Sequence, residues 1–125
     1  MPELPKRGCR IFVVDDDLVA RDCLRRSLAF AGHTVETANS GVEALARFEQ
    51  DKFDLVILDY QMPEMKGDEL ALLIKVLAPN QPIFMVTAYP DTVARNLLTE
   101  VDLIISKPFE SQQLHSAIDK LFATP

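Results

Sequence analysis

The chain has 125 residues, of which 48% are hydrophobic and 26% are charged, and its formal net charge at pH 7 is -6. This balance is typical of a globular domain with a single hydrophobic core, and it argues against a disordered or fibrous chain. The acidic net charge, without a basic patch, argues against direct binding to nucleic acid. Because no apolar run approaches the roughly 18 residues of a membrane span, we expect a cytoplasmic protein with no membrane contact.

The ends of the folded region and the state of the cysteines follow from local composition. Residues 1–8 are polar and contain proline, which predicts a flexible leader before a single domain at residues 9–123. Cys9 and Cys23 are too few for a disulfide framework and lie in different predicted elements. We therefore expect two buried, reduced thiols.

Five short runs of β-branched and aliphatic residues recur along the chain, each about as long as a strand. They are residues 10–15, 34–38, 55–59, 83–87 and 103–106. Three of them contain the continuously apolar segments IFVV, LVIL and IFMV, which indicate central parallel strands covered on both faces. Helical periodicity lies between the runs, so the chain predicts an α/β fold with a doubly wound five-stranded parallel sheet.

Several predicted helices carry boundary signals. The first helix begins near Leu18 and ends at Gly32, a residue that readily adopts the left-handed conformation. Ser40 followed by Glu43 is a capping box, and Pro79 ends the third helix. Apolar residues at helical spacing predict the core-facing stripes: Val19, Cys23, Leu24 and Leu28 in the first helix, and Leu114, Ala117, Ile118, Leu121 and Phe122 in the last.

Ligands of open α/β sheets bind at the carboxyl ends of the strands, and here those ends carry polar residues. They are Asp15, Asp16 and Asp17 after the first strand, Asp59 on the third, Thr87 on the fourth and Lys107 after the fifth. Converging carboxylates need a compensating cation, and oxygen ligands without nearby His or Cys favour Mg²⁺ over Ca²⁺, with Mn²⁺ as a substitute. Lys107 and Thr87 can bind phosphate oxygens, so the set predicts a phosphoryl pocket with a carboxylate nucleophile.

Each of these residues also has a plainer interpretation when it is taken alone. Asp17 is better explained as the N-cap of the first helix, a role that Asp15 or Asp16 could share. Thr87 could simply end a strand, and Lys107 could be a solvated surface charge. Their joint placement at strand ends favours the pocket. His33 and His115 have no partner at ligand spacing, which indicates surface or helix-packing roles.

Five motifs, in this order, resemble the receiver domains of two-component response regulators. They are VVDDD at residues 13–17, LDYQMP at 58–63, MKG at 65–67, VTA at 86–88 and KPF at 107–109. The resemblance covers the chain from about Cys9 to Phe122. It implies a flavodoxin-like (βα)5 fold with strand order 2-1-3-4-5. This order is known from a chemotaxis member of the family, so it follows here from the resemblance and not from the residues.

The resemblance also implies roles for individual residues. Asp59 corresponds to the phosphoacceptor, and Asp15, Asp16, Asp59 and the backbone carbonyl of Gln61 correspond to the ligands of Mg²⁺. Thr87, Lys107 and the backbone N–H of Ala88 would contact the phosphoryl group. The peptide bond of Lys107-Pro108 is a candidate for the cis form, which is almost confined to X-Pro bonds.

The chain departs from the family pattern before the fifth strand, where Glu100-Val101 replaces the common Gly-Ala pair, and at the position of the usual switch residue. Three residues before the lysine, where the family usually has an aromatic residue or His that moves inward on activation, this chain has Ile104. We expect Ile104 to pack as a core side chain; a switch in which Tyr89 supplies the moving ring is the second hypothesis.

Two further classes of function compete with the phosphoacceptor. A pseudo-receiver that acts only as a docking module would usually have lost an acid or the lysine. An enzyme fits poorly, because an aspartyl phosphohydrolase needs an acid where Gln61 stands, and the acids at 15–17 would repel a dinucleotide. The family resemblance implies a sensor histidine kinase or a histidine phosphotransfer protein as phosphodonor, and an output partner on the face of the fourth helix, fifth strand and fifth helix.

Overall fold

One sheet of five parallel strands organises the protein. The structure, a computed structural model, describes residues 8–91 and 100–123. The strands are β1 (Arg10–Val14), β2 (Thr34–Ala38), β3 (Leu55–Asp59), β4 (Ile83–Thr87) and β5 (Leu103–Ser106). Their order across the sheet is β2-β1-β3-β4-β5, which confirms the predicted doubly wound arrangement and the order implied by the resemblance.

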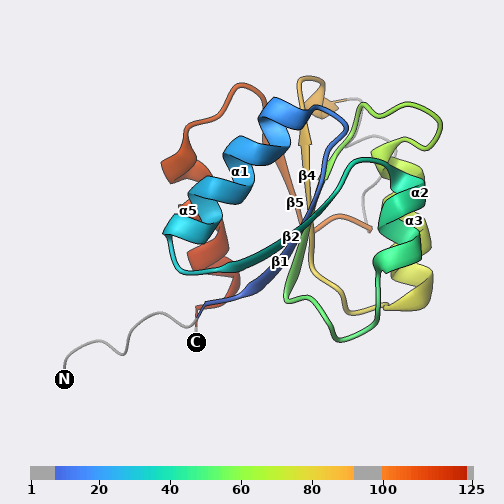
Figure 1. Ribbon diagram of the computed structural model, residues 1–125, viewed down its shortest axis with the longest axis horizontal. Coiled ribbons are helices and arrows are strands. Elements are labelled where there is room, and N and C mark those ends of the chain that lie inside the picture. The colour runs from blue at the N-terminus through green and yellow to red at the C-terminus, as the bar shows by residue number, and fades with distance from the viewer. Residues whose placement is uncertain (1–7, 92–99, 124–125) are drawn as a thin grey trace.

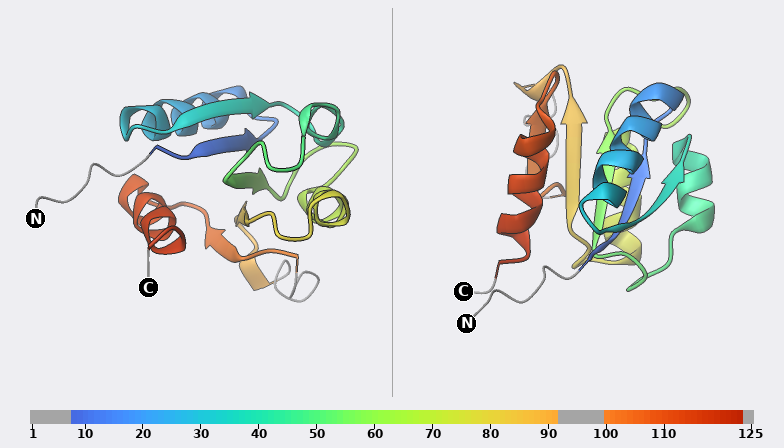
Figure 2. Two further views of the ribbon diagram at one scale, coloured as in Figure 1. Left: turned by 90° about the horizontal axis from the view of Figure 1, so that it is seen from below. Right: turned by 60° about the vertical axis from the view of Figure 1, so that its left-hand side comes forward.

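Helices cover both faces of the sheet (Figures 1 and 2). Helices α1 (Leu18–Phe30) and α5 (Ser111–Leu121) lie on one face, and α2 (Gly41–Arg47) and α3 (Gly67–Leu77) lie on the other. The expected fourth helix falls largely at positions 92–99, and most of the expected leader at positions 1–7, so both lie outside the described residues. Within the described part of the chain, no helix is long and apolar enough to cross a membrane.

Alternate side chains of each central strand enter different hydrophobic clusters, because successive strand residues point to opposite faces. On the α1 and α5 face, Ile11 and Val13 of β1 pack with Leu28 and Ile118. On the α2 and α3 face, Phe12 of β1 packs among the residues that include Leu70 and Ile74. Burial on both faces explains why these strands are continuously apolar.

The helix ends follow the predicted signals. Asp17 caps α1 by accepting a hydrogen bond from the Val19 N–H at 3.0 Å, and Gly32 follows the helix with φ of 100°. Ser40 caps α2 through the N–H of Glu43 at 3.0 Å. The Glu43 carboxylate accepts from the N–H of Asn39 at 2.6 Å, so it closes the box one residue earlier than the standard pattern.

The predicted core face of α1 was partly wrong. Val19 is 69% exposed and Cys23 is also exposed, whereas Leu24 and Leu28 pack into the core. The buried line runs through residues four apart, and the position before each lies about 100° around the helix, toward solvent. Cys9 is only partly buried, so the expectation of two buried thiols was also wrong, although neither cysteine forms a disulfide within the described part of the chain.

The last helix shows a smaller difference. Leu114 and Ile118 are buried and Ala117 and Leu121 pack against the same cluster, as predicted. Phe122 is the C-cap of α5 and is 40% exposed, because the helix ends before this position completes another inward turn.

Candidate functional site

The acidic turn between β1 and α1 is fixed by hydrogen bonds of its own residues. The Asp15 N–H donates to the Ala38 carbonyl at 3.2 Å, which extends the pairing of β1 with β2 by one residue. The Asp15 carboxylate accepts from the Asp17 N–H at 2.9 Å, and Asp17 in turn caps α1. As a result Asp15 is almost fully buried, with 3% of its surface exposed, while Asp16 is exposed.

Asp59 is the last residue of β3 and lies close to the start of α3. Beyond it, the Tyr60 N–H donates to the Val86 carbonyl at 3.0 Å, and the Gly67 N–H donates to the Tyr60 carbonyl at 2.9 Å. A Cβ atom on Gly67 would lie 2.6 Å from the Asp59 carbonyl oxygen. Only glycine therefore permits α3 to begin this close to the strand end that carries Asp59.

Thr87 and Lys107 approach Asp59 from the two strands on its other side. The Lys107 N–H donates to the Thr87 carbonyl at 2.8 Å, which extends the pairing of β4 with β5. The Lys107 ammonium donates to the Asp59 carboxylate at 2.8 Å. Thr87 is buried, and its hydroxyl oxygen accepts from the Tyr89 N–H at 2.9 Å. The Lys107-Pro108 peptide bond is cis, as the resemblance implied.

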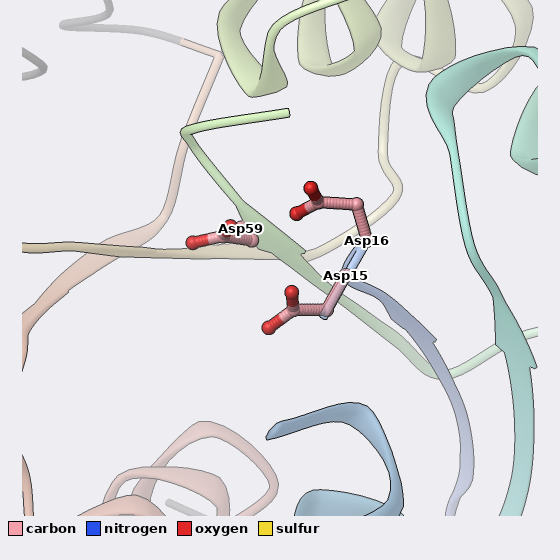
Figure 3. A group of neighbouring side chains, drawn as sticks. All are labelled: Asp15, Asp16 and Asp59. Atoms are coloured by element: carbon pink, nitrogen blue, oxygen red, sulfur yellow. The ribbon is translucent and has the colours of Figure 1, made fainter. Parts of the chain in front are cut away.

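Three carboxylates meet beside this ion pair. The ligand atoms of Asp15, Asp16 and Asp59 all lie within 4.8 Å of one another, and the three side chains point to the same side of the strand ends (Figure 3). Oxygen donors of this kind, two of them buried, fit a hard divalent cation of the Mg²⁺ class. Lys107 supplies one positive charge against the three carboxylates. The cluster therefore keeps negative charge that would stabilise a divalent cation.

Burial and mutual repulsion disturb the ionisation of the site. Burial, opposed in part by the Asp17 N–H and reinforced by the charge of Asp59, raises the pKa of Asp15 to about 6. Burial also raises the pKa of Asp59, although the hydrogen bond from Lys107 opposes the rise. For Lys107, burial favours the neutral form, but the carboxylate of Asp59 outweighs it and the pKa is raised. The metal-free site therefore holds its protons more tightly than isolated acids do.

A cavity of about 670 Å³ opens from the acids along α1 toward α5. Asp15 and Lys107 line one part of it, and Ser27 and Ser111 line another, with apolar side chains among them. The Ser27 hydroxyl lies 2.7 Å from the Ser111 hydroxyl and 2.9 Å from Nε2 of His115, so α1 and α5 are joined by hydrogen bonds. Sequence spacing does not reveal these hydrogen bonds, because the residues that form them lie in separate helices.

The remaining candidate residues are at or near the site. Gln61 is exposed two positions after Asp59, and Ala88 lines the cavity. Ile104 is partly buried and packs against the cluster on the α2 and α3 face, in keeping with the expected core role. Tyr89, the alternative switch residue, is 58% exposed.

Known proteins share both the sequence pattern and the fold. A sequence profile described as the response regulator receiver domain matches residues 11–119. The response regulator MprA of Mycobacterium ulcerans (strain Agy99) is 40% identical over 107 residues, which are 84% of this chain and 46% of that protein. The MprA protein of Mycobacterium leprae (strain TN) is 39% identical over 114 residues, 90% of this chain and 50% of that protein.

Two solved structures are similar over almost their whole length. A CheY-like receiver domain protein from Methanospirillum hungatei JF-1 has a TM-score of 0.84 and 33% identity, covering 91% of this chain and 93% of that one. The response regulator TrrA from Thermotoga maritima, solved in complex with Mg²⁺-BeF, has a TM-score of 0.82 and 34% identity, covering 90% and 98%.

The fold and the acidic strand ends thus define a phosphoacceptor module of the α/β class. This chain belongs to the family of response regulator receiver domains, the signalling modules of two-component systems. It spans about half the length of the curated relatives that it matches.

Proposed function

We propose that Asp59 accepts a phosphoryl group from a phosphohistidine of a sensor histidine kinase or histidine phosphotransfer protein. A carboxylate oxygen of Asp59 attacks phosphorus, the phosphorus–nitrogen bond breaks, and the donor histidine keeps the electron pair and takes up a proton. The contact between Lys107 and Asp59 at 2.8 Å carries the proposal, because it holds a cation where the new phosphoryl oxygens would lie.

Other residues would complete the pocket. The Thr87 hydroxyl oxygen accepts one hydrogen bond, from Tyr89, so its own proton is available for a phosphoryl oxygen. The Ala88 N–H would be a further donor. Asp15, Asp16, Asp59 and the Gln61 carbonyl would hold Mg²⁺, and Mn²⁺ would substitute. When bound, the cation supplies positive charge that offsets the carboxylates and the phosphoryl oxygens.

The phosphodonor would dock over the cavity beside α1. This surface opens directly from the acids and is lined by apolar side chains, including Ala20, Leu24 and Phe109. A partner placed there would present its histidine to Asp59 while it shields the reacting groups from water. Because such a donor acts in the cytoplasm, we infer a cytoplasmic location for the protein. The only reactions that we assign to the chain are its own phosphorylation and dephosphorylation.

Phosphorylation would change the binding of an output partner. Once the phosphoryl group binds Lys107 and Thr87, the contact of Lys107 with the Asp59 carboxylate must be rearranged, and the Thr87 hydroxyl, which accepts from Tyr89, donates its own proton to a new acceptor. Thr87 is the last residue of β4, and Lys107 directly follows the neighbouring strand β5, which carries Leu103 at 39% exposure. We propose that the output surface is formed by β5, α5 and the expected fourth helix, which precedes β5. That fourth helix lies outside the described residues.

Intact-mass measurement after incubation with acetyl phosphate and Mg²⁺ tests the assignment. One added phosphoryl group is expected on the wild type and on Asp51→Asn, a control at an exposed position where φ is 68° and asparagine is well tolerated. Asp59→Asn and omission of the metal should each abolish the addition. A folded wild-type protein that acquires no phosphoryl group would instead be a docking pseudo-receiver.

A further inference from the structure

An arginine of α1 reaches back over the first turn of its helix to the end of β1. Nη1 of Arg21 donates a partly buried hydrogen bond to the backbone carbonyl of Asp15 at 2.8 Å. By contrast, Arg25 and Arg26 of the same helix pair with the carboxylate of Asp22 at the surface. Arg21 therefore contacts the backbone of the acidic site, whereas its neighbours form ion pairs with an acid of their own helix.

The position of Arg21 in the helix indicates that this contact does more than provide a hydrogen-bond acceptor for the guanidinium. The first turn of an α-helix carries the positive end of the helix dipole, so a cation there is disfavoured and an acid is favoured. Helix α1 has no acidic residue in its first turn. The acids at positions 15–17 before the helix offset this cost, and the guanidinium of Arg21 bonds to the Asp15 carbonyl, where it holds the strand end.

The bond acts on the peptide that leads to Asp16, the acid of the cluster whose carboxylate has no hydrogen-bond donor among the described residues. The carbonyl of Asp15 belongs to the planar peptide group that joins Asp15 to Asp16, so its orientation sets the direction in which Asp16 leaves the strand. The carboxylates of Asp15 and Asp59 are held by the Asp17 N–H and by Lys107. The carboxylate of Asp16 is exposed and accepts no hydrogen bond from residues 8–91 or 100–123.

We propose that Arg21 is a positioning residue of the divalent-cation site, which orients Asp16 toward Asp15 and Asp59 by holding the peptide between Asp15 and Asp16. This inference rests on the proposed function, because it concerns the same cation. Groups that orient metal ligands without touching the metal typically change its affinity by roughly 10- to 100-fold when they are replaced. A backbone contact one residue away from the ligand places Arg21 near the lower end of that range.

Titration calorimetry with Mg²⁺ alone, on matched α1 variants, tests this role. Arg21→Met keeps the length of the side chain but removes its donors, and we expect the dissociation constant for Mg²⁺ to rise roughly tenfold. Arg25→Met removes an arginine of the same helix that pairs with Asp22, and this variant should bind Mg²⁺ as the wild type does. Arg21→Lys retains one donor of similar reach and should recover part of the affinity.

A second measurement separates positioning from general stability. Unfolding temperatures in EDTA should be similar for the Met variants at positions 21 and 25, and the amide resonance of Asp16 should move only in the first. Wild-type affinity in Arg21→Met would overturn the inference, as would a loss of affinity shared by both variants in proportion to their stability. A wild-type protein that binds no Mg²⁺ would overturn the proposed function itself, which is a distinguishable result.

Discussion

The buried carboxyl group of Asp15 gives the site its sharpest dependence on pH. Its pKa rises from 3.8 to about 6, chiefly because burial disfavours the charged form. Between these two values the folded protein retains a proton that the unfolded chain has released. The favourable contribution of Asp15 to the free energy of unfolding is therefore fully present below about pH 3.8, and it is lost as the pH rises through about 6.

Replacement of Asp15 by asparagine should stabilise the metal-free protein at pH 8. Asn cannot ionise but can still accept the hydrogen bond from the Asp17 N–H. The rise in pKa to about 6 corresponds to at most about 3 kcal/mol, and this advantage should shrink as the pH falls toward 4. Urea unfolding in EDTA across this range measures it. A difference from wild type that stays constant with pH would contradict the prediction.

Residues at strand ends were predictable where a fold rule connects them. Asp59 and Lys107 are 48 positions apart, yet the order of the strands alone places them at one edge of the sheet. Arg21 was not predictable, because its partner is a backbone carbonyl and any residue could provide one. The raised pKa of Asp15 likewise depends on a burial that sequence spacing does not reveal.

At the scale of single elements, helix α2 depends on its cap. It has only seven residues, and isolated helices of that length are unstable in water. The Ser40 hydroxyl satisfies the Glu43 N–H at 3.0 Å, while Glu43 itself binds the Asn39 N–H. These two bonds fix the point at which the chain leaves β2 and enters the helix.

Ser40→Ala should therefore lower the free energy of unfolding by about 1 kcal/mol. The lost hydroxyl leaves the Glu43 N–H without its partner. Urea denaturation monitored by circular dichroism measures the change. Ser116→Ala, at an exposed position of α5, is the control and should stay within about 0.5 kcal/mol of wild type. Equal effects of the two substitutions would show that the cap contributes nothing.

The strands were easier to predict than the faces of the helices. Strands β1, β3 and β4 are buried on both sides, so all their residues except Arg10, Asp59 and Thr87 at the strand ends are apolar, and register hardly affects the pattern. For helix α1 the buried face must also be identified, and by spacing alone Val19 and Cys23 fit a core position as well as Leu24 and Leu28 do. Which of two adjacent stripes is buried depends on how the helix is rotated against the sheet.

At the scale of the whole molecule, binding of a cation to the three acids should add to the stability of the fold. A ligand at 100 times its dissociation constant stabilises the folded state by about 2.7 kcal/mol. The cation needs ionised carboxylates, and the pKa of Asp15 is about 6, so the effect should be larger at pH 8 than at pH 5.5.

Thermal unfolding with Mg²⁺ and with EDTA at the two pH values measures this linkage. We expect a Tm higher by several degrees with Mg²⁺ at pH 8, a smaller rise at pH 5.5, and little rise in Asp59→Asn, which lacks one of the three ligands. Equal rises in wild type and variant would mean that Mg²⁺ acts at some other place.

The strand order also has a consequence for biosynthesis. Strand β5 is the last strand in the chain and lies at one edge of the sheet, beside β4. The sheet is therefore complete only after β5 has been added. A nascent chain on the ribosome therefore exposes Asp15, Asp16 and Asp59 well before Lys107 has been translated. The ammonium group that neutralises part of this charge therefore reaches the three acids only after the last strand has been made.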